Sequence, residues 1–121
     1  MAQLLKLDTF TAESGDLTVF EKLMPGFIKR FFYVYETDEP ERFGYRHRTA
    51  WHALICLNGS CRMYTNDGAD ESFFVLDNPQ KCLIVEPKDW YQIDQFSPGG
   101  VLLVMSNDYY HPEDIIYEKY P

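Results

Sequence analysis

Short stretches of alternating apolar and polar residues, each ended by turn-forming residues, run along most of the chain. A period of two residues is typical of strands, and it predicts them over about 17–20, 28–35, 50–57, 61–65, 72–76, 81–85, 91–95 and 101–106. Turns such as Asn58-Gly59 and Asn66-Asp67-Gly68 separate neighbouring strands. This spacing predicts an all-β fold that covers its own edges, and a double-stranded β-helix, the jelly-roll barrel, fits best.

The end of the chain has a different pattern. Capping residues and Pro112 precede the apolar run Ile115-Ile116-Tyr117, which predicts a short C-terminal helix or turn that acts as a lid or an interface element. A chain of 121 residues has room for one sizeable core. We therefore expect residues 1–121 to form a single domain.

Composition and charge narrow the range of partners. The net charge of −8 argues against a nucleic acid or an anionic membrane as the main partner. The sequence has no long apolar stretch of the kind that signal peptides and membrane spans need, so we expect a cytoplasmic protein. The three cysteines, Cys56, Cys61 and Cys82, lie in apolar strands without Cys-x-x-Cys spacing and are expected to be reduced core residues.

One segment concentrates the polar chemistry of this acidic chain. Tyr45 and His47 stand two residues apart, so they project from the same face of a strand. A titratable pair on a face that should be buried indicates a site. By the same count His52 lies on the opposite face and is expected to be structural, whereas His111 precedes a proline and should be exposed. The basic residues gather near this segment, at Lys29, Arg30, Arg42, Arg46 and Arg48.

The chain resembles the bacterial sugar 3,4-ketoisomerases of the WxcM-like cupin group, the FdtA/QdtA type, which act on dTDP-4-keto-6-deoxyglucose. The resemblance rests on Lys29-Arg30-Phe31-Phe32-Tyr33, Arg42, the run from Leu54 to Cys61, Pro87-x-x-Trp90 and Ser106-Asn107-Asp108-Tyr109-Tyr110. It implies a cupin fold, a dTDP-linked 4-keto-6-deoxy sugar as ligand, and a role in deoxysugar and surface-polysaccharide synthesis, such as that of lipopolysaccharide. It also implies a homodimer that exchanges N-terminal strands.

Three positions depart from the pattern of that family. The family carries His-x-His where this chain has Tyr45-Arg46-His47, a histidine where it has Tyr91, and an arginine where it has Ser14. One reading is an isomerase or a close variant, such as a 3,5-epimerase-like enzyme. Another is a catalytically silent cupin that binds a nucleotide-sugar, and a third is a pocket for an unrelated small acid or a dimer scaffold.

The chemistry of a 3,4-ketoisomerase assigns expected roles. A base removes the C3 proton of a 4-keto sugar to give an enediolate, and a proton returns at C4. His47, with an ordinary pKa of about 6.5, is the expected base. Tyr45 or Tyr91 is the expected general acid, with a neighbouring arginine lowering the tyrosine pKa from about 10 toward a useful range.

The remaining candidates are binding residues. Arg42 is the first expected substrate contact and Arg30 the next, while Arg46 and Arg48 either hold the diphosphate or lie on the outer face. For stacking on the thymine or the sugar, or for the core, the candidates are Trp51, Trp90, Tyr33 and Tyr35. No metal or cofactor is expected, because the His-x-His, Glu and later His of metal-binding cupins are incomplete.

Overall fold

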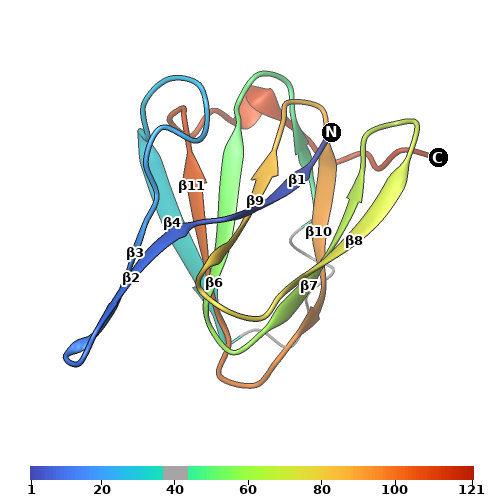
Figure 1. The fold of residues 1–121 in the computed structure, drawn as a ribbon. Coiled ribbons are helices and arrows are strands. Elements are labelled where there is room, and N and C mark those ends of the chain that lie inside the picture. The colour runs from blue at the N-terminus through green and yellow to red at the C-terminus, as the bar shows by residue number, and fades with distance from the viewer. Residues whose placement is uncertain (37–43) are drawn as a thin grey trace.

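The computed structural model describes residues 1–36 and 44–121, and its regular structure is almost entirely β-strand (Figure 1). The strands are β1 (Gln3–Lys6), β2 (Asp8–Ala12), β3 (Gly15–Val19), β4 (Arg30–Tyr35), β5 (Arg46–His47), β6 (His52–Asn58), β7 (Cys61–Asn66), β8 (Glu71–Leu76), β9 (Lys81–Val85), β10 (Trp90–Phe96), β11 (Val101–Ser106) and β12 (Ile115–Ile116). Within the described ranges there is no helix of the length and apolar character that a membrane crossing needs.

Two antiparallel sheets form the barrel. One has the strand order β1-β9-β6-β11-β4 and the other β10-β7-β8. Alternate residues of the strands fill the space between the sheets, among them Leu54 and Cys56 from β6 and Leu102 and Val104 from β11. The predicted all-β barrel is confirmed.

The five-stranded sheet is apolar on its outer face as well. Ala53, Ile55 and Met105 belong to a second buried cluster there, which Phe20 and Met24 from the N-terminal part of the chain cover. The β2–β3 hairpin, in contrast, projects away from both sheets (Figure 1).

The expected strands agree closely with β4 and with β6 to β11, and Gly59 adopts the positive φ that its turn predicts. Four strands were missed: β1, β2, β5 and β12. The last two have two residues each and pair with one another, Ile115 opposite His47. A periodic pattern cannot show partners so short and so far apart in sequence. The expected helix or turn near the C-terminus is a 3₁₀ turn over Pro112–Asp114.

Asp114 ties this turn to the connection between β5 and β6. Its carboxylate accepts hydrogen bonds from the backbone N–H and the hydroxyl of Thr49, at 3.0 and 2.8 Å, and from the N–H of Ala50 at 3.3 Å. Its carbonyl oxygen accepts a bond from the N–H of Arg48 at 2.8 Å. The C-terminal segment is therefore fixed beside β5.

We predict that Asp114→Ala lowers the free energy of unfolding by about 1–3 kcal/mol, because three donors lose their acceptor. Urea denaturation at pH 7 measures the change. Glu113→Ala is the matched control, since the Glu113 side chain is 80% exposed and only its backbone carbonyl is bonded to Arg48. Equal stabilities of the two variants would contradict the role given to the Asp114 carboxylate.

Candidate active site

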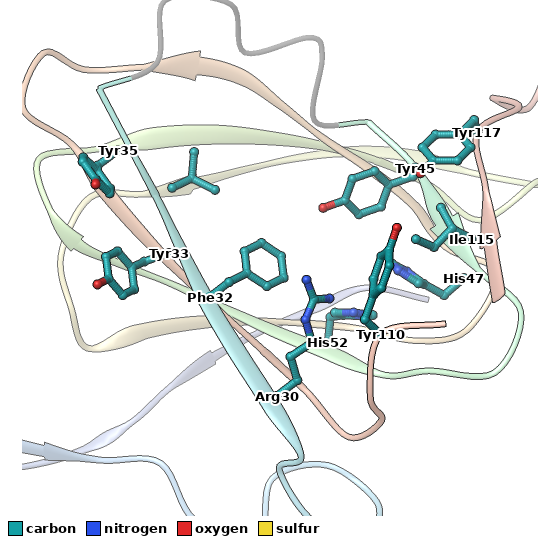
Figure 2. A pocket seen from close by; sticks show the side chains of 11 residues that line it. Arg30, Phe32, Tyr33, Tyr35, Tyr45, His47, His52, Tyr110, Ile115 and Tyr117 are labelled. Carbon is teal, nitrogen blue, oxygen red and sulfur yellow. The ribbon is translucent and has the colours of Figure 1, made fainter. Parts of the chain in front are cut away.

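A cavity of about 390 Å³ opens beside β4, between β5 and the C-terminal segment (Figure 2). The side chains that line it come from three strands of the barrel, the residue before β5 and the last part of the chain. They are Arg30, Phe32, Tyr33, Val34, Tyr35, Tyr45, His47, His52, Tyr110, Ile115 and Tyr117.

Two imidazoles meet in this cavity. The rings of His47 and His52 lie 4.0 Å apart between centroids and are tilted by 31°, and the side chains are only 7% and 2% exposed. The expectation that His52 faces away from His47 is wrong. Residues 48–51 form a bend and irregular chain, not strand, so the alternation that starts at Tyr45 does not continue to position 52. His52 instead shares the barrel-facing side of β6 with Leu54.

Both imidazoles are neutral at pH 7. The pKa of His47 is lowered to about 4, chiefly by burial; Asp114 partly opposes this shift and Arg30 contributes to it. The pKa of His52 is lowered to about 3 by burial, the largest cause, together with the neighbouring His47 and Arg30. Each ring therefore has a nitrogen lone pair free to accept a proton.

Two tyrosines pack around the imidazoles. The Tyr45 ring lies edge-on to His47 and to Tyr91, each at 5.3 Å between centroids, so the predicted common face of Tyr45 and His47 is confirmed. Tyr91 is buried behind the cavity wall. Burial raises the pKa of both phenols and outweighs Arg30, which lowers it. The expectation of a depressed tyrosine pKa is wrong, and both phenols are protonated hydrogen-bond donors.

Arg30 brings the positive charge into the cavity. Its guanidinium lies 4.7 Å from the ring centre of Phe32 and 5.0 Å from that of Tyr110, and Figure 2 shows it pointing toward His52. Among the described residues that line the cavity, it is the only lysine or arginine. Arg30 is therefore placed to stabilise a negative charge that develops beside the imidazoles.

The structure brings two further expected binding residues to the cavity. Tyr33 and Tyr35 border it from the more exposed face of β4, with their rings stacked 5.9 Å apart. Trp90 does not line the cavity: it is buried, and its indole N–H donates to the side-chain oxygen of Gln92 at 3.1 Å.

The expected arginines are distributed differently. Arg46 stacks on Tyr120 at 3.9 Å, and Arg48 donates from Nε to the carbonyl of Glu113 at 3.2 Å. Both therefore contact the C-terminal segment and do not line the cavity. Arg42 lies outside the described residues. The substrate contacts expected of these three residues stay predictions.

Sequence reasoning missed the contribution of the C-terminal segment to the site. Tyr110, Ile115 and Tyr117 line the cavity, and the Tyr117 ring lies 6.3 Å from that of Tyr45. The apolar run after Pro112 was a signal for an element that covers something, but the pattern did not show which part of the barrel it covers.

The other predicted polar residues agree with the structure. All three cysteines are buried and free, and His111 is exposed, with Asp108 and Glu113 nearby. Across residues 1–36 and 44–121, no three histidine, cysteine or acidic side chains converge as metal ligands would. That the protein works without a metal or cofactor stays a prediction.

The barrel holds a cavity that is lined by polar and apolar side chains, among them two neutral imidazoles and one arginine. This is a small-ligand site of the kind that enzymes use for proton transfer. The family model described as "FdtA: WxcM-like, C-terminal" matches residues 1–120. The chain belongs to this family.

Individual relatives agree with this assignment. The chain is 38% identical over 106 residues to the TDP-4-oxo-6-deoxy-alpha-D-glucose-3,4-oxoisomerase of Aneurinibacillus thermoaerophilus, covering 84% of this chain and 76% of that protein. The WlaRB TDP-quinovose 3,4-ketoisomerase of Campylobacter jejuni superposes with a TM-score of 0.87 at 30% identity, over 97% of this chain and 92% of that one. QdtA of Thermoanaerobacterium thermosaccharolyticum, a sugar 3,4-ketoisomerase in complex with TDP, gives 0.86 at 30% identity, over 97% and 88%. The expected cupin fold is confirmed.

The lowered pKa of His52 predicts an acid-sensitive fold. An unfolded imidazole takes up its proton near pH 6.5, whereas folded His52 does so only near pH 3. The stability that this difference represents is present above pH 6.5 and is lost as the pH falls toward 3. Between pH 7 and 4.5 we expect His52 to account for a loss on the order of 2–3 kcal/mol.

Urea denaturation of wild type and His52→Gln at both pH values measures this contribution. The glutamine variant should lose less stability on acidification than wild type. The exposed His111→Gln is the control and should follow wild type. Parallel losses in wild type and His52→Gln would show that burial does not suppress protonation at this position.

Proposed function

We propose that this protein is a nucleotide-sugar isomerase that moves the keto group of a dTDP-linked 4-keto-6-deoxyhexose from C4 to C3, in deoxysugar biosynthesis. The carrying observation is a similarity to 3,4-ketoisomerases over 97% of the chain together with a neutral His47 in the cavity. One of these relatives was solved with TDP, and a variant of it with TDP-4-keto-6-deoxyglucose. Both complexes support a ligand of this class.

The cavity residues divide the chemistry. His47 removes the C3 proton, the bonding electrons form the C3–C4 double bond, and the charge moves to O4 as an enediolate. Arg30 stabilises that charge, and the Tyr45 hydroxyl donates a hydrogen bond within the same site. Once the hydroxyl hydrogen has passed from O3 to O4, His47 returns its proton to C4, and the O3 electrons form the carbonyl at C3.

The remaining predicted contacts extend the site toward the nucleotide. Tyr33 and Tyr35 offer exposed, stacked rings at the border of the cavity, a surface suited to a thymine base. Arg42, with Arg46 and Arg48, stays the candidate for the diphosphate. Trp90 supports the wall from the core.

The tyrosines at positions 45 and 91 do not favour a silent binding protein. A protein that has lost its proton transfer would need no accessible base, yet His47 lies in the cavity with its lone pair free at neutral pH. A tyrosine that stays protonated is a suitable donor to an enediolate. Both features support catalysis over binding alone.

We predict that wild type, incubated with dTDP-4-keto-6-deoxyglucose in D₂O, incorporates deuterium at the exchanging carbon and forms a 3-keto product. His47→Asn should abolish both, since proton transfer by a positioned side chain contributes about 10²–10⁴-fold. Proton NMR measures both quantities.

His111→Asn is the control, because His111 is exposed and lies outside the cavity. Its rate should equal that of wild type. If dTDP raises the melting temperature of wild type but neither exchange nor product appears, the isomerase proposal fails for this substrate and a nucleotide-sugar binder is favoured.

The N-terminal strands support a homodimer. Phe10 and Leu17 are opposite each other on the projecting β2–β3 hairpin, and they are 64% and 59% exposed. An isolated hairpin with an exposed apolar pair is only marginally stable in water. A second copy that covers this hairpin would bury the pair.

The proposed substrate supports a cytoplasmic location for the protein, because nucleotide-sugars are charged metabolites that stay on one side of a membrane. There the product would be used to build surface polysaccharides such as lipopolysaccharide.

We predict that Phe10→Ser combined with Leu17→Ser converts a dimer into a monomer, as measured by light scattering after size-exclusion chromatography. Phe73→Ser is the matched control, since Phe73 is 56% exposed but lies on β8 of the other sheet. A dimer mass that persists in the hairpin variant would exclude the hairpin as the interface.

A further inference from the structure

The proposed isomerisation moves two protons, and His47 accounts for one of them. The hydrogen on C3 must reach C4, and the hydrogen of the O3 hydroxyl must reach O4 when that oxygen changes from carbonyl to hydroxyl. The second transfer needs a group that accepts a proton from one oxygen and gives a proton to its neighbour. Such a group must lie in the same cavity as His47.

His52 meets the positional requirement. It lines the cavity, is only 2% exposed, and its ring lies 4.0 Å from that of His47 between centroids. Its Nδ1 atom is buried, and no residue in the described part of the chain hydrogen-bonds to it. A buried polar atom without a partner has a free-energy cost that a structural histidine would avoid by bonding to the backbone. A structural role alone therefore does not explain this histidine in the cavity wall.

Four polar groups near the imidazoles are less suited to the task. The phenols of Tyr45 and Tyr91 are buried, which opposes formation of a phenolate, so they donate protons more readily than they accept them. Arg30 stays protonated and has no lone pair to accept with. Asp114 is engaged with Thr49 and Ala50. The second imidazole has both a donor and an acceptor nitrogen, so it can accept one proton while it gives another and need not become charged.

We propose that His52 is a second acid–base residue, which relays the hydroxyl proton from O3 to O4 while His47 carries the carbon-bound proton from C3 to C4. This proposal rests on the proposed isomerase function. In the enediolate, His52 accepts the proton from O3 and donates a proton to O4, so the negative charge moves to O3. The O3 electrons form the new carbonyl as His47 protonates C4. Both histidines end in their starting protonation states.

The two transfers have different signatures in D₂O. Deuterium enters at C3 once the carbon proton has left and returned, which requires His47 alone. The 3-keto product also requires the transfer between the oxygens. His52→Gln keeps a polar side chain at the start of β6 but has no titratable nitrogen. With dTDP-4-keto-6-deoxyglucose, this variant should exchange the C3 hydrogen within a few-fold of wild type and form product about 10²–10⁴-fold more slowly.

A merely structural role would not separate exchange from product formation. If His52→Gln forms product at the wild-type rate, or if exchange and product formation fall by the same factor, the relay is overturned. His52→Ala, which leaves space for a small base, is the second variant: added imidazole should restore product formation without changing C3 exchange. Absence of rescue in a folded alanine variant that binds dTDP counts against the proposal.

Failure of the underlying function is recognised separately. If wild type itself neither exchanges the C3 hydrogen nor forms product, both the isomerase function and the relay role of His52 are rejected. If wild type isomerises and the glutamine variant does so equally well, the function holds and only the relay falls. Melting temperatures of all variants in the presence of dTDP establish that each one is folded and occupied.

Discussion

The site depends on how β5 is held, because this two-residue strand supplies His47 and belongs to neither of the two main sheets. On one side, Tyr45 and Tyr91 form a β-bridge with two hydrogen bonds of 3.1 Å. On the other, β12 pairs with it, Ile115 opposite His47. The carbonyl of His47 also accepts a bond from Lys88 N–H at 2.6 Å. These backbone contacts, with the Asp114 carboxylate, fix the imidazole in a chain segment too short to fix it alone.

The same arrangement determines the electrostatics of the cavity. Two imidazoles lie 4.0 Å apart between ring centroids, beside Tyr45, Tyr91 and Arg30. Protonation of either imidazole would place a buried cation close to the Arg30 guanidinium. The rings therefore stay neutral at the pH of a cell, and each is a weaker base than an exposed imidazole. The cost is stability in acid, and the benefit is a base that does not have to lose a proton before it acts.

Much of the fold was predictable, whereas the composition of the site was predictable only in part. The strands of the two sheets are visible in the sequence because each buries one face against a neighbour, and the pair Tyr45 and His47 follows from the same alternation. His52 was assigned to the wrong face because residues 48–51 are not strand, and the alternation of side chains along a strand does not continue through a bend. Tyr110 and Tyr117 reach the cavity only through tertiary pairing of β12 with β5, which depends on contacts nearly 70 residues apart.

The tyrosines at positions 45 and 91 acquire a physical rationale from this environment. The resemblance to the family leads one to expect histidines there, but two buried imidazoles already lie beside Arg30 at the cavity. A further buried imidazole would be held neutral by the same burial and the same arginine, and would add another weak base to a site that has two. A phenol whose pKa is raised by burial provides a neutral donor that keeps its proton until an enediolate approaches. Exchanging imidazole for phenol at these positions therefore changes the balance of donors and acceptors without removing the means of moving protons.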